Sequence, residues 1–194
     1  MPYPITIKMS TTKKNVILTQ LFHAPCGVLV LGSIDSQLCL CDWQVEPHRD
    51  HVDRRLTKAL QAEMREGPSA VTERTAAELG EYFAGQRRSF DIPLQLVGTP
   101  FQQMVWRSLL DIAYGQTRSY ADIARSIGRP SSVRAVANAN GANALSILVP
   151  CHRVIGSDHS LTGYGGGLKA KHYLLTLEGI QTGRGDNDGP CLPF

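Results

Sequence analysis

A cysteine and a histidine stand next to each other at Cys151 and His152, inside the segment Pro150–Val154. A cysteine attacks an electrophile as its thiolate, so a nucleophilic cysteine needs a nearby base or positive charge that lowers its pKa. His152 is a candidate for that base, but neighbouring side chains on an extended segment point apart, so a turn or a water molecule has to link the two. Because a free cysteine is more often a small buried hydrophobe, the pair alone leaves both interpretations open.

The charged residues are unevenly distributed along the chain. Residues 1–95 contain 11 Lys/Arg and 11 Asp/Glu, a net charge of zero, whereas Gly115–Gly156 contains five arginines against the single acid Asp122, a net charge of +4. A basic segment in a nearly neutral protein favours a polyanionic partner such as nucleic acid. A solvated basic face has the same composition, so charge alone does not decide between the two.

The basic segment belongs to a run of predicted short helices. Thr99-Pro100 is typical of a helix start, and Ser119, followed by an acid three residues later, is typical of a second one. Arg129-Pro130-Ser131 predicts a tight turn before a third, alanine-rich helix over Ser132–Gly141. Two short helices joined by a tight turn indicate a helix-turn-helix, although many helix hairpins with this pattern never contact DNA.

The first half of the chain has mixed helix and strand patterns. Apolar stripes at helical spacing predict helices over His51–Glu66 and Thr72–Ala84. Phe90–Leu96 indicates a strand that Pro93 weakens, and the apolar run Leu145–Val149 indicates a buried strand leading to the cysteine. An antiparallel meander is predicted at the start of the chain, over Lys14–Phe22, Gly27–Ser33 and Gln37–Trp43.

The overall composition is that of a globular protein. The chain has 194 residues, of which 42% are hydrophobic and 19% charged, and this excludes a wholly disordered chain. No apolar run is long enough to span a membrane, and Met1–Asn15 lacks the apolar core of an export signal. Five cysteines, an odd number, favour free thiols in a reducing, cytoplasmic setting over a disulfide framework.

The segment Pro150–Val154 resembles the active-site pentapeptide of the O6-alkylguanine-DNA alkyltransferases, also called methylated-DNA–protein-cysteine methyltransferases. The similarity is closest to bacterial members. It covers roughly Gly98–Gly179, and the first half resembles the family only in its strand-rich layout. The other matching segments follow in family order and spacing: Phe101–Trp106, Gly115–Ala124, Val133–Val136, Ala142-Asn143, Thr162–Gly167, Lys171 and Leu174–Gly179.

The resemblance implies an α+β fold in two domains. Residues 1–96 are expected to form a small, strand-rich, RNase H-like α/β domain. Residues 97–182 are expected to form a mostly helical, winged-helix-like domain that carries the helix-turn-helix, and residues 183–194 a flexible tail.

The resemblance also implies a reaction. The protein is expected to bind duplex DNA as a monomer, flip an O6-alkylguanine out of the stack, and transfer the alkyl group irreversibly to Cys151 in one turnover. Extrusion is required because the alkyl carbon is otherwise enclosed by the duplex. Neither a metal nor a cofactor is needed. The preferred alkyl size, activity on O4-alkylthymine and cooperative binding to DNA are left open.

Four residues carry the catalytic roles that the resemblance implies. Cys151 is the alkyl acceptor, and a water molecule joins it to His152. Glu178 orients His152, and Asn143 braces the turn that holds the cysteine. Taken singly, Glu178 is equally typical of a helix-end acid and Asn143 of a helix cap.

Seven further residues are expected to contact DNA or the damaged base. Tyr120 helps to rotate the 3′ phosphate, Arg134 fills the gap that the flipped base leaves, and Lys171 supports the site electrostatically. Each residue type also has a purely structural explanation. Tyr120 could pack in the core, Arg134 could be an exposed charge on a helix, and Lys171 could be a surface lysine. The remaining four are Val154, Ser157, Tyr164, which walls the alkyl pocket, and Gly165.

This sequence departs from the mammalian pattern near the pocket. Ser146 stands where a proline narrows the pocket, Gly165 where a serine contacts the substrate, and Asn140–Ala142 where larger or charged groups stand on the recognition helix. The chemistry is expected to be intact, while these changes put the DNA footprint and the limit on alkyl size in doubt.

Three other functions compete with this interpretation. A non-catalytic helix-turn-helix sensor of alkylated DNA is disfavoured because the related branch carries tryptophan where Cys151 stands. A thiol redox protein lacks a resolving cysteine near Cys151. Zinc binding in the first half lacks a C-x-x-C spacing among the candidate ligands, which are Cys26, Cys39, Cys41, His23, His48 and His51.

Overall fold

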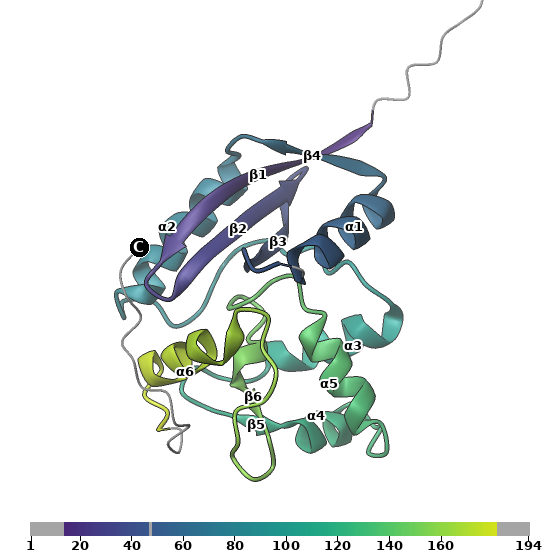
Figure 1. The fold of residues 1–194 in the computed structure, drawn as a ribbon, viewed down its shortest axis with the longest axis vertical. Helices are drawn as coiled ribbons and strands as arrows, with labels where there is room; N and C mark the ends of the chain where they lie inside the picture. Colours follow the sequence, from purple (N-terminus) through teal and green to yellow (C-terminus); the bar gives the residue numbers. More distant parts are fainter. Residues whose placement is uncertain (1–13, 47, 182–194) are drawn as a thin grey trace, which may run out of the picture.

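The computed structural model describes residues 14–46 and 48–181. A twisted sheet flanked by two helices makes up one end of the molecule, and four further helices make up the other (Figure 1). Two predictions concern residues outside these ranges. One is for Met1–Asn15, of which only the last two residues are described, and the other is for the tail 183–194, which includes Cys191.

Three strands form the meander that the sequence predicts. They are β1 (Asn15–Ala24), β2 (Gly27–Ile34) and β3 (Gln37–Trp43), and each pairs antiparallel with the next. A fourth strand, β4 (Ala62–Glu66), runs parallel to β1, so the strand order is β3-β2-β1-β4.

The prediction of a single helix over His51–Glu66 is wrong in its last third. Helix α1 (His48–Leu60) ends before Gln61, whose φ of 49° leaves the helical region. The following residues form β4 because the free edge of β1 offers backbone partners, and Met64 pairs there opposite Ile17. Met64 continues the apolar stripe of α1, so the sequence pattern alone does not reveal the break.

Helix α2 (Ala70–Phe83) confirms the helix predicted over Thr72–Ala84. Its N-terminus is closed by a capping box, in which Ser69 and Thr72 each accept from the other's backbone N–H. Gly85 follows the helix with φ 72°, a conformation that glycine adopts without strain.

The prediction of a strand over Phe90–Leu96 is also wrong. Only one isolated bridge forms there, between Leu38 and Leu94, with Leu38 N–H donating to the Pro93 carbonyl at 2.8 Å. Proline has no backbone N–H, so this segment cannot continue a ladder along the edge of β3.

The first three helices of the second half begin where the sequence predicts, and a fourth helix follows for which the sequence pattern indicates no start. They are α3 (Pro100–Leu110), α4 (Tyr120–Ser126), α5 (Val133–Gly141) and α6 (Gly167–Leu177). Capping boxes at Thr99 and Ser119 start α3 and α4, and the structure confirms the two short helices and tight turn proposed for a helix-turn-helix. Two short parallel strands, β5 (Arg118–Ser119) and β6 (Val154–Ile155), brace this end.

The run Leu145–Val149 is a buried turn rather than the predicted strand. Ile147 has φ 72°, and only Leu145 forms a bridge, with Cys41 of β3. Cys41 N–H donates to the Ala144 carbonyl at 2.8 Å, so the sheet directly supports the segment that leads to the cysteine.

The hydrophobic core is continuous across the two ends of the molecule. One cluster joins Trp43 and Tyr82 on the sheet side to Trp106, Val136 and Leu174 on the helical side. Within the described residues, no helix is long and apolar enough to cross a membrane.

Candidate active site

Cys151 begins a single 3-10 turn, η1 (Cys151–Arg153), and is 4% exposed. Asn143 Nδ2 donates to Cys151 Sγ at 3.1 Å and to the Val149 carbonyl at 2.9 Å. Asn143 Oδ1 also accepts the Leu145 N–H at 3.0 Å. One amide therefore holds the turn and contacts the thiol.

Burial raises the pKa of the Cys151 thiol to about 11, because the thiolate loses its hydration. The Asn143 amide, the Lys171 ammonium and the Ser146 hydroxyl act in the opposite direction by favouring the thiolate. In this resting state the thiol is protonated at neutral pH, so a base has to take its proton before attack.

His152 and Glu178 form a buried pair beside the cysteine. His152 Nε2 lies 2.9 Å from Glu178 Oε1, and both side chains are fully buried. Glu178 caps the C-terminal end of α6, which brings it back to the turn that carries the cysteine.

Glu178 accepts hydrogen bonds from several groups at once. Burial raises the pKa of its carboxyl, but the hydrogen bonds from His152 and Arg153 outweigh burial and hold that pKa at about 2. Arg153 donates to it through Nε at 2.8 Å and Nη2 at 2.9 Å, and Tyr82 donates its hydroxyl at 2.7 Å. Glu178 is therefore ionised at neutral pH.

The ionised carboxylate fixes the protonation of His152. Its Nε2 carries the proton that Glu178 accepts, so in the neutral ring Nδ1 holds a free lone pair. Burial lowers the pKa of His152 while Glu178 opposes that effect. His152 Nδ1 is buried and has no hydrogen-bond partner among residues 14–46 and 48–181, which leaves it available as a base.

Lys171 lies in the buried wall of the site. Its Nζ donates to the Val154 carbonyl at 2.6 Å and to the Thr162 carbonyl at 2.8 Å. Burial lowers the pKa of Lys171 to about 8. The ammonium is thus fixed by two carbonyls and supports a negative charge on Cys151.

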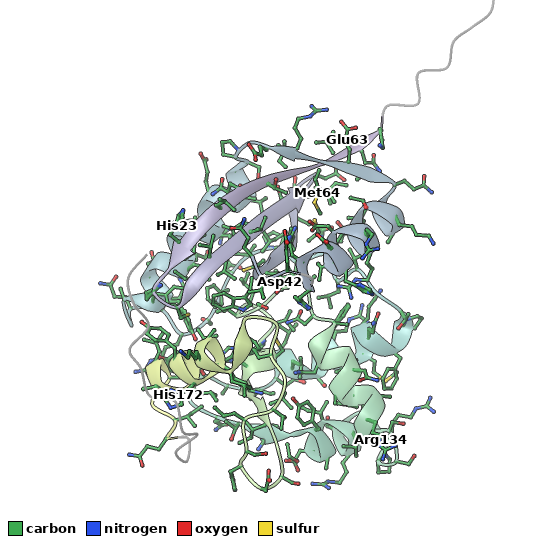
Figure 2. The ribbon with its side chains drawn as sticks, viewed as in Figure 1. His23, Asp42, Glu63, Met64, Arg134 and His172 are labelled. Atoms are coloured by element: carbon green, nitrogen blue, oxygen red, sulfur yellow. The ribbon has the colours of Figure 1, made fainter. Side chains whose placement is uncertain are left out.

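The remaining predicted residues fall into three groups. Tyr120 lines a groove of about 400 Å3 together with Tyr164 and Gly165. Arg134 and Ser157 are exposed, and neither lines this groove. Arg134 points outward from α5 (Figure 2), and its guanidinium forms no hydrogen bond or ion pair with any described residue. The Val154 side chain is buried in the core.

Sequence reasoning missed several residues of the site. Arg153 counts toward the basic segment, yet it is 6% exposed and neutralises Glu178 instead of facing solvent. Asp42 is buried between the sheet and the helices (Figure 2), where it contacts His48 and Ser146. The sequence contained one indication of Asp42, because it is a single acid inside the otherwise apolar run Leu38–Trp43.

Among the described residues no group of three or more His, Cys, Asp or Glu could hold a metal ion. Cys39 and Cys41 are both buried in the sheet, and Cys39 Sγ donates to the Gly32 carbonyl at 3.5 Å.

A buried thiol next in sequence to a buried histidine–glutamate pair, in a molecule that also carries two short helices joined by a tight turn, indicates a protein with cysteine-dependent chemistry. Comparison with known proteins gives the family. Residues 100–180 match the family described as the DNA-binding domain of 6-O-methylguanine DNA methyltransferase.

Curated relatives cover most of the chain. A methylated-DNA–protein-cysteine methyltransferase of Mycobacterium tuberculosis is 45% identical over 158 residues, which are 80% of this chain and 88% of the relative. The constitutive enzyme of Bacillus subtilis is 44% identical over 159 residues, 81% of this chain and 93% of the relative. The chain belongs to the methylated-DNA–protein-cysteine methyltransferase family, as its sequence predicts.

Solved structures agree with this assignment. The M. tuberculosis O6-methylguanine methyltransferase has a TM-score of 0.71 and 43% identity, over 84% of this chain and 92% of that one. The M. tuberculosis protein in complex with DNA gives the same TM-score at 42% identity, with the same coverage of both chains. The protein is therefore a DNA-repair methyltransferase, and the non-catalytic sensor is not favoured.

Proposed function

We propose that the protein repairs O6-alkylguanine in duplex DNA by transferring the alkyl group to Cys151 in one irreversible turnover. The observation that carries this proposal is the contact set of Cys151. Its thiol lies against Asn143, next in sequence to a His152–Glu178 pair in which the His152 Nδ1 atom is buried and has no hydrogen-bond partner within the described part of the chain.

The first step is removal of the thiol proton. The lone pair of His152 Nδ1 takes that proton through a bridging water, which satisfies the buried nitrogen. Glu178 stabilises the imidazolium that forms, because it is already ionised and bonded to Nε2. Asn143 and Lys171 stabilise the thiolate.

The second step is displacement at the alkyl carbon. The Cys151 sulfur forms a bond to that carbon as the bond from the carbon to O6 breaks, and the electron pair passes to the guanine. A proton delivered to the base then yields neutral guanine. Burial raises the pKa of Tyr120, so its hydroxyl stays protonated and can donate to the departing base. The S-alkyl cysteine that results ends the turnover.

The exposed face of α5 is the proposed contact with DNA. Arg134 fills the gap left by the extruded base, and Ser157, beyond β6, contacts DNA or the damaged base. In this assignment residues 97–182 act as a winged-helix-like DNA-binding domain, and the strand order β3-β2-β1-β4 supports an RNase H-like domain at 1–96. Gly165 shapes the base pocket, and Val154 contributes through its backbone carbonyl, which accepts a hydrogen bond from Lys171. The protein acts as a monomer, and O4-alkylthymine is a candidate second substrate.

Intact mass spectrometry tests this function. Mixing the protein with excess duplex containing O6-methylguanine should add one methyl group per chain, on the peptide that carries Cys151. Cys151→Ala should bind the duplex and gain no mass. Repeated turnover, or a methyl group on Cys26, Cys39, Cys41 or Cys191 instead, would contradict the proposal.

A further inference from the structure

A narrow pocket lies beside the reactive sulfur. The space in it that a water-sized group can fill is about 10 Å3, roughly one water molecule, whereas the adjoining groove offers about 400 Å3 by the same measure. Its lining residues come from the helical end of the chain with one exception: Asn140, Gly141, Asn143, Ser146, Cys151, Gly163, Tyr164 and Gly165, together with His48.

His48 is that exception, because it opens α1 on the sheet side of the molecule. It lines both the narrow pocket and the groove, as do Gly141 and the segment Gly163–Gly165. These residues form the boundary that an alkyl group has to pass when the base enters from the groove. Of this set, His48 alone has a large side chain that comes from outside the family's DNA-binding region at 100–180.

The imidazole of His48 is held from two sides. Its Nε2 lies 3.0 Å from Asp42 Oδ2, and Asp42 is fully buried at the end of β3. A Cβ placed on Gly165 would lie 2.9 Å from the same nitrogen, so the ring packs directly on the bare backbone there. The ring is therefore clamped between a buried carboxylate and a glycine.

Asp42 also connects this ring to the wall next to the cysteine. Its second oxygen, Oδ1, accepts the Ser146 hydroxyl at 3.0 Å, and Ser146 lines the narrow pocket with Cys151. The loop opposite is supported from the same strand, because Trp43 packs on Gly166 and meets the Tyr164 ring edge-on at 6.1 Å. A movement of Ser146 or of the Tyr164–Gly166 loop would therefore break contacts to β3.

We propose that His48, positioned by Asp42, is a specificity-determining residue that closes the alkyl pocket and restricts transfer to small alkyl groups. The inference rests on the proposed function, since it concerns the pocket of Cys151. It assigns to α1 and β3, on the sheet side, a direct part in choosing the substrate. A bulky alkyl group must displace the imidazole from Asp42, whereas a methyl group fits beside it.

The test compares alkyl groups of two sizes on the same sulfur. We would measure single-turnover rates of Cys151 alkylation by intact mass, with O6-methylguanine duplex and with the free base O6-benzylguanine. His48→Ala should raise the ratio of benzyl to methyl rates by about tenfold or more. His48→Asn, which retains a donor for the buried Asp42, should raise it as well and guards against misfolding of the alanine variant.

His51→Ala is the matched control, since His51 lies on the same helix and is exposed. It should leave both rates at the wild-type values. An unchanged ratio in both folded His48 variants, or a wild-type protein that accepts the benzyl group as readily as the methyl group, would overturn the inference.

A second readout separates this inference from the proposed function. Methyl and benzyl methanethiosulfonate modify cysteines without any guanine chemistry, and peptide mapping reports the two rates at Cys151. His48→Ala should raise the benzyl-to-methyl ratio here too. A protein that shows this change but takes no methyl group from DNA would refute the proposed function alone. One that methylates itself while neither ratio responds to His48 would refute the inference alone.

Discussion

The Tyr82 hydroxyl donates to Glu178 Oε1 at 2.7 Å, which joins a helix that packs on the sheet to the carboxylate of the reaction site. The two residues are 96 positions apart, and both are buried. Glu178 Oε1 is also the atom that His152 contacts, so the phenol helps to set where the imidazole lies.

Tyr82→Phe should slow alkyl transfer and destabilise the fold. The variant keeps the ring that packs on Phe83 and Phe90 but removes a hydrogen bond to a charged group, a loss of about 2 kcal/mol. Single-turnover rates and urea unfolding measure the two effects. Tyr114→Phe is the control, because that hydroxyl donates to the backbone carbonyl of Leu177 at 2.9 Å. Equal rate defects in the two variants would show that Tyr82 acts only through stability.

Glu178→Gln should reduce the transfer rate roughly 100-fold or more, while the affinity for DNA changes little. The neutral amide no longer stabilises the imidazolium of His152, and it leaves the buried Arg153 without its counter-charge, at a cost of about 3 kcal/mol in stability. Quenched single-turnover reactions give the transfer rate, and equilibrium binding to undamaged duplex gives the affinity for DNA. A parallel loss in both would contradict a role confined to the thiol proton.

The ionisation of Glu178 also predicts acid sensitivity. Its pKa is about 2 in the folded protein against 4.5 for an unperturbed glutamate. Because the folded-state pKa is lowered, the stabilising contribution is complete above about pH 4.5 and is lost as the pH falls toward 2. Urea unfolding between pH 6 and pH 3 should show a falling free energy of unfolding. The free energy of unfolding should fall less steeply with decreasing pH in Glu178→Gln than in the wild type. An equal dependence on pH in the two proteins would assign the acid sensitivity to other groups.

Arg134→Ala tests the geometry of DNA binding. A residue that replaces an extruded base offsets an unstacking cost of a few kcal/mol, which is smallest when the base is already unpaired. The variant should therefore be slowest on a well-paired duplex, less impaired on single-stranded DNA, and close to wild type on O6-benzylguanine if the pocket admits it. Rates at two salt concentrations distinguish this role from a phosphate contact, whose loss lowers the salt dependence by about one counterion. An equal defect on duplex and free base would mean that Arg134 supports the reaction site itself.

Local sequence signals were sufficient where the structure depends on neighbouring residues. The capping hydroxyls of Thr99 and Ser119 and the alternating strands of the meander identify their own elements. The strand β4 could not be predicted in this way, because Met64 continues a helical stripe and only the distant edge of β1 decides its conformation. The same limit applies to Leu145–Val149, which is apolar because it is buried, not because it is extended.

The site shows the same division. The resemblance to the alkyltransferase family pointed to Cys151, His152, Glu178 and Asn143, and the structure places these residues together. Tyr82, which bonds to Glu178, and Asp42, which bonds to His48 and Ser146, lie in a half of the chain without a recognisable motif. Their contacts to the second half depend on how the two ends of the molecule pack. Sequence spacing carries no information about a contact of that kind.

The bridge between Asp42 and Ser146 spans 104 positions of the chain, and it has a consequence for biosynthesis. Contacts so distant in sequence close late in folding, after the loop between them has been ordered. While a ribosome is still making α6, the nascent protein has Cys151 but neither its carboxylate Glu178 nor the fixed Lys171. We expect the emerging thiol to behave as an ordinary cysteine until Glu178 and Lys171 have been made and have packed around it, so an unfinished site does not consume the protein.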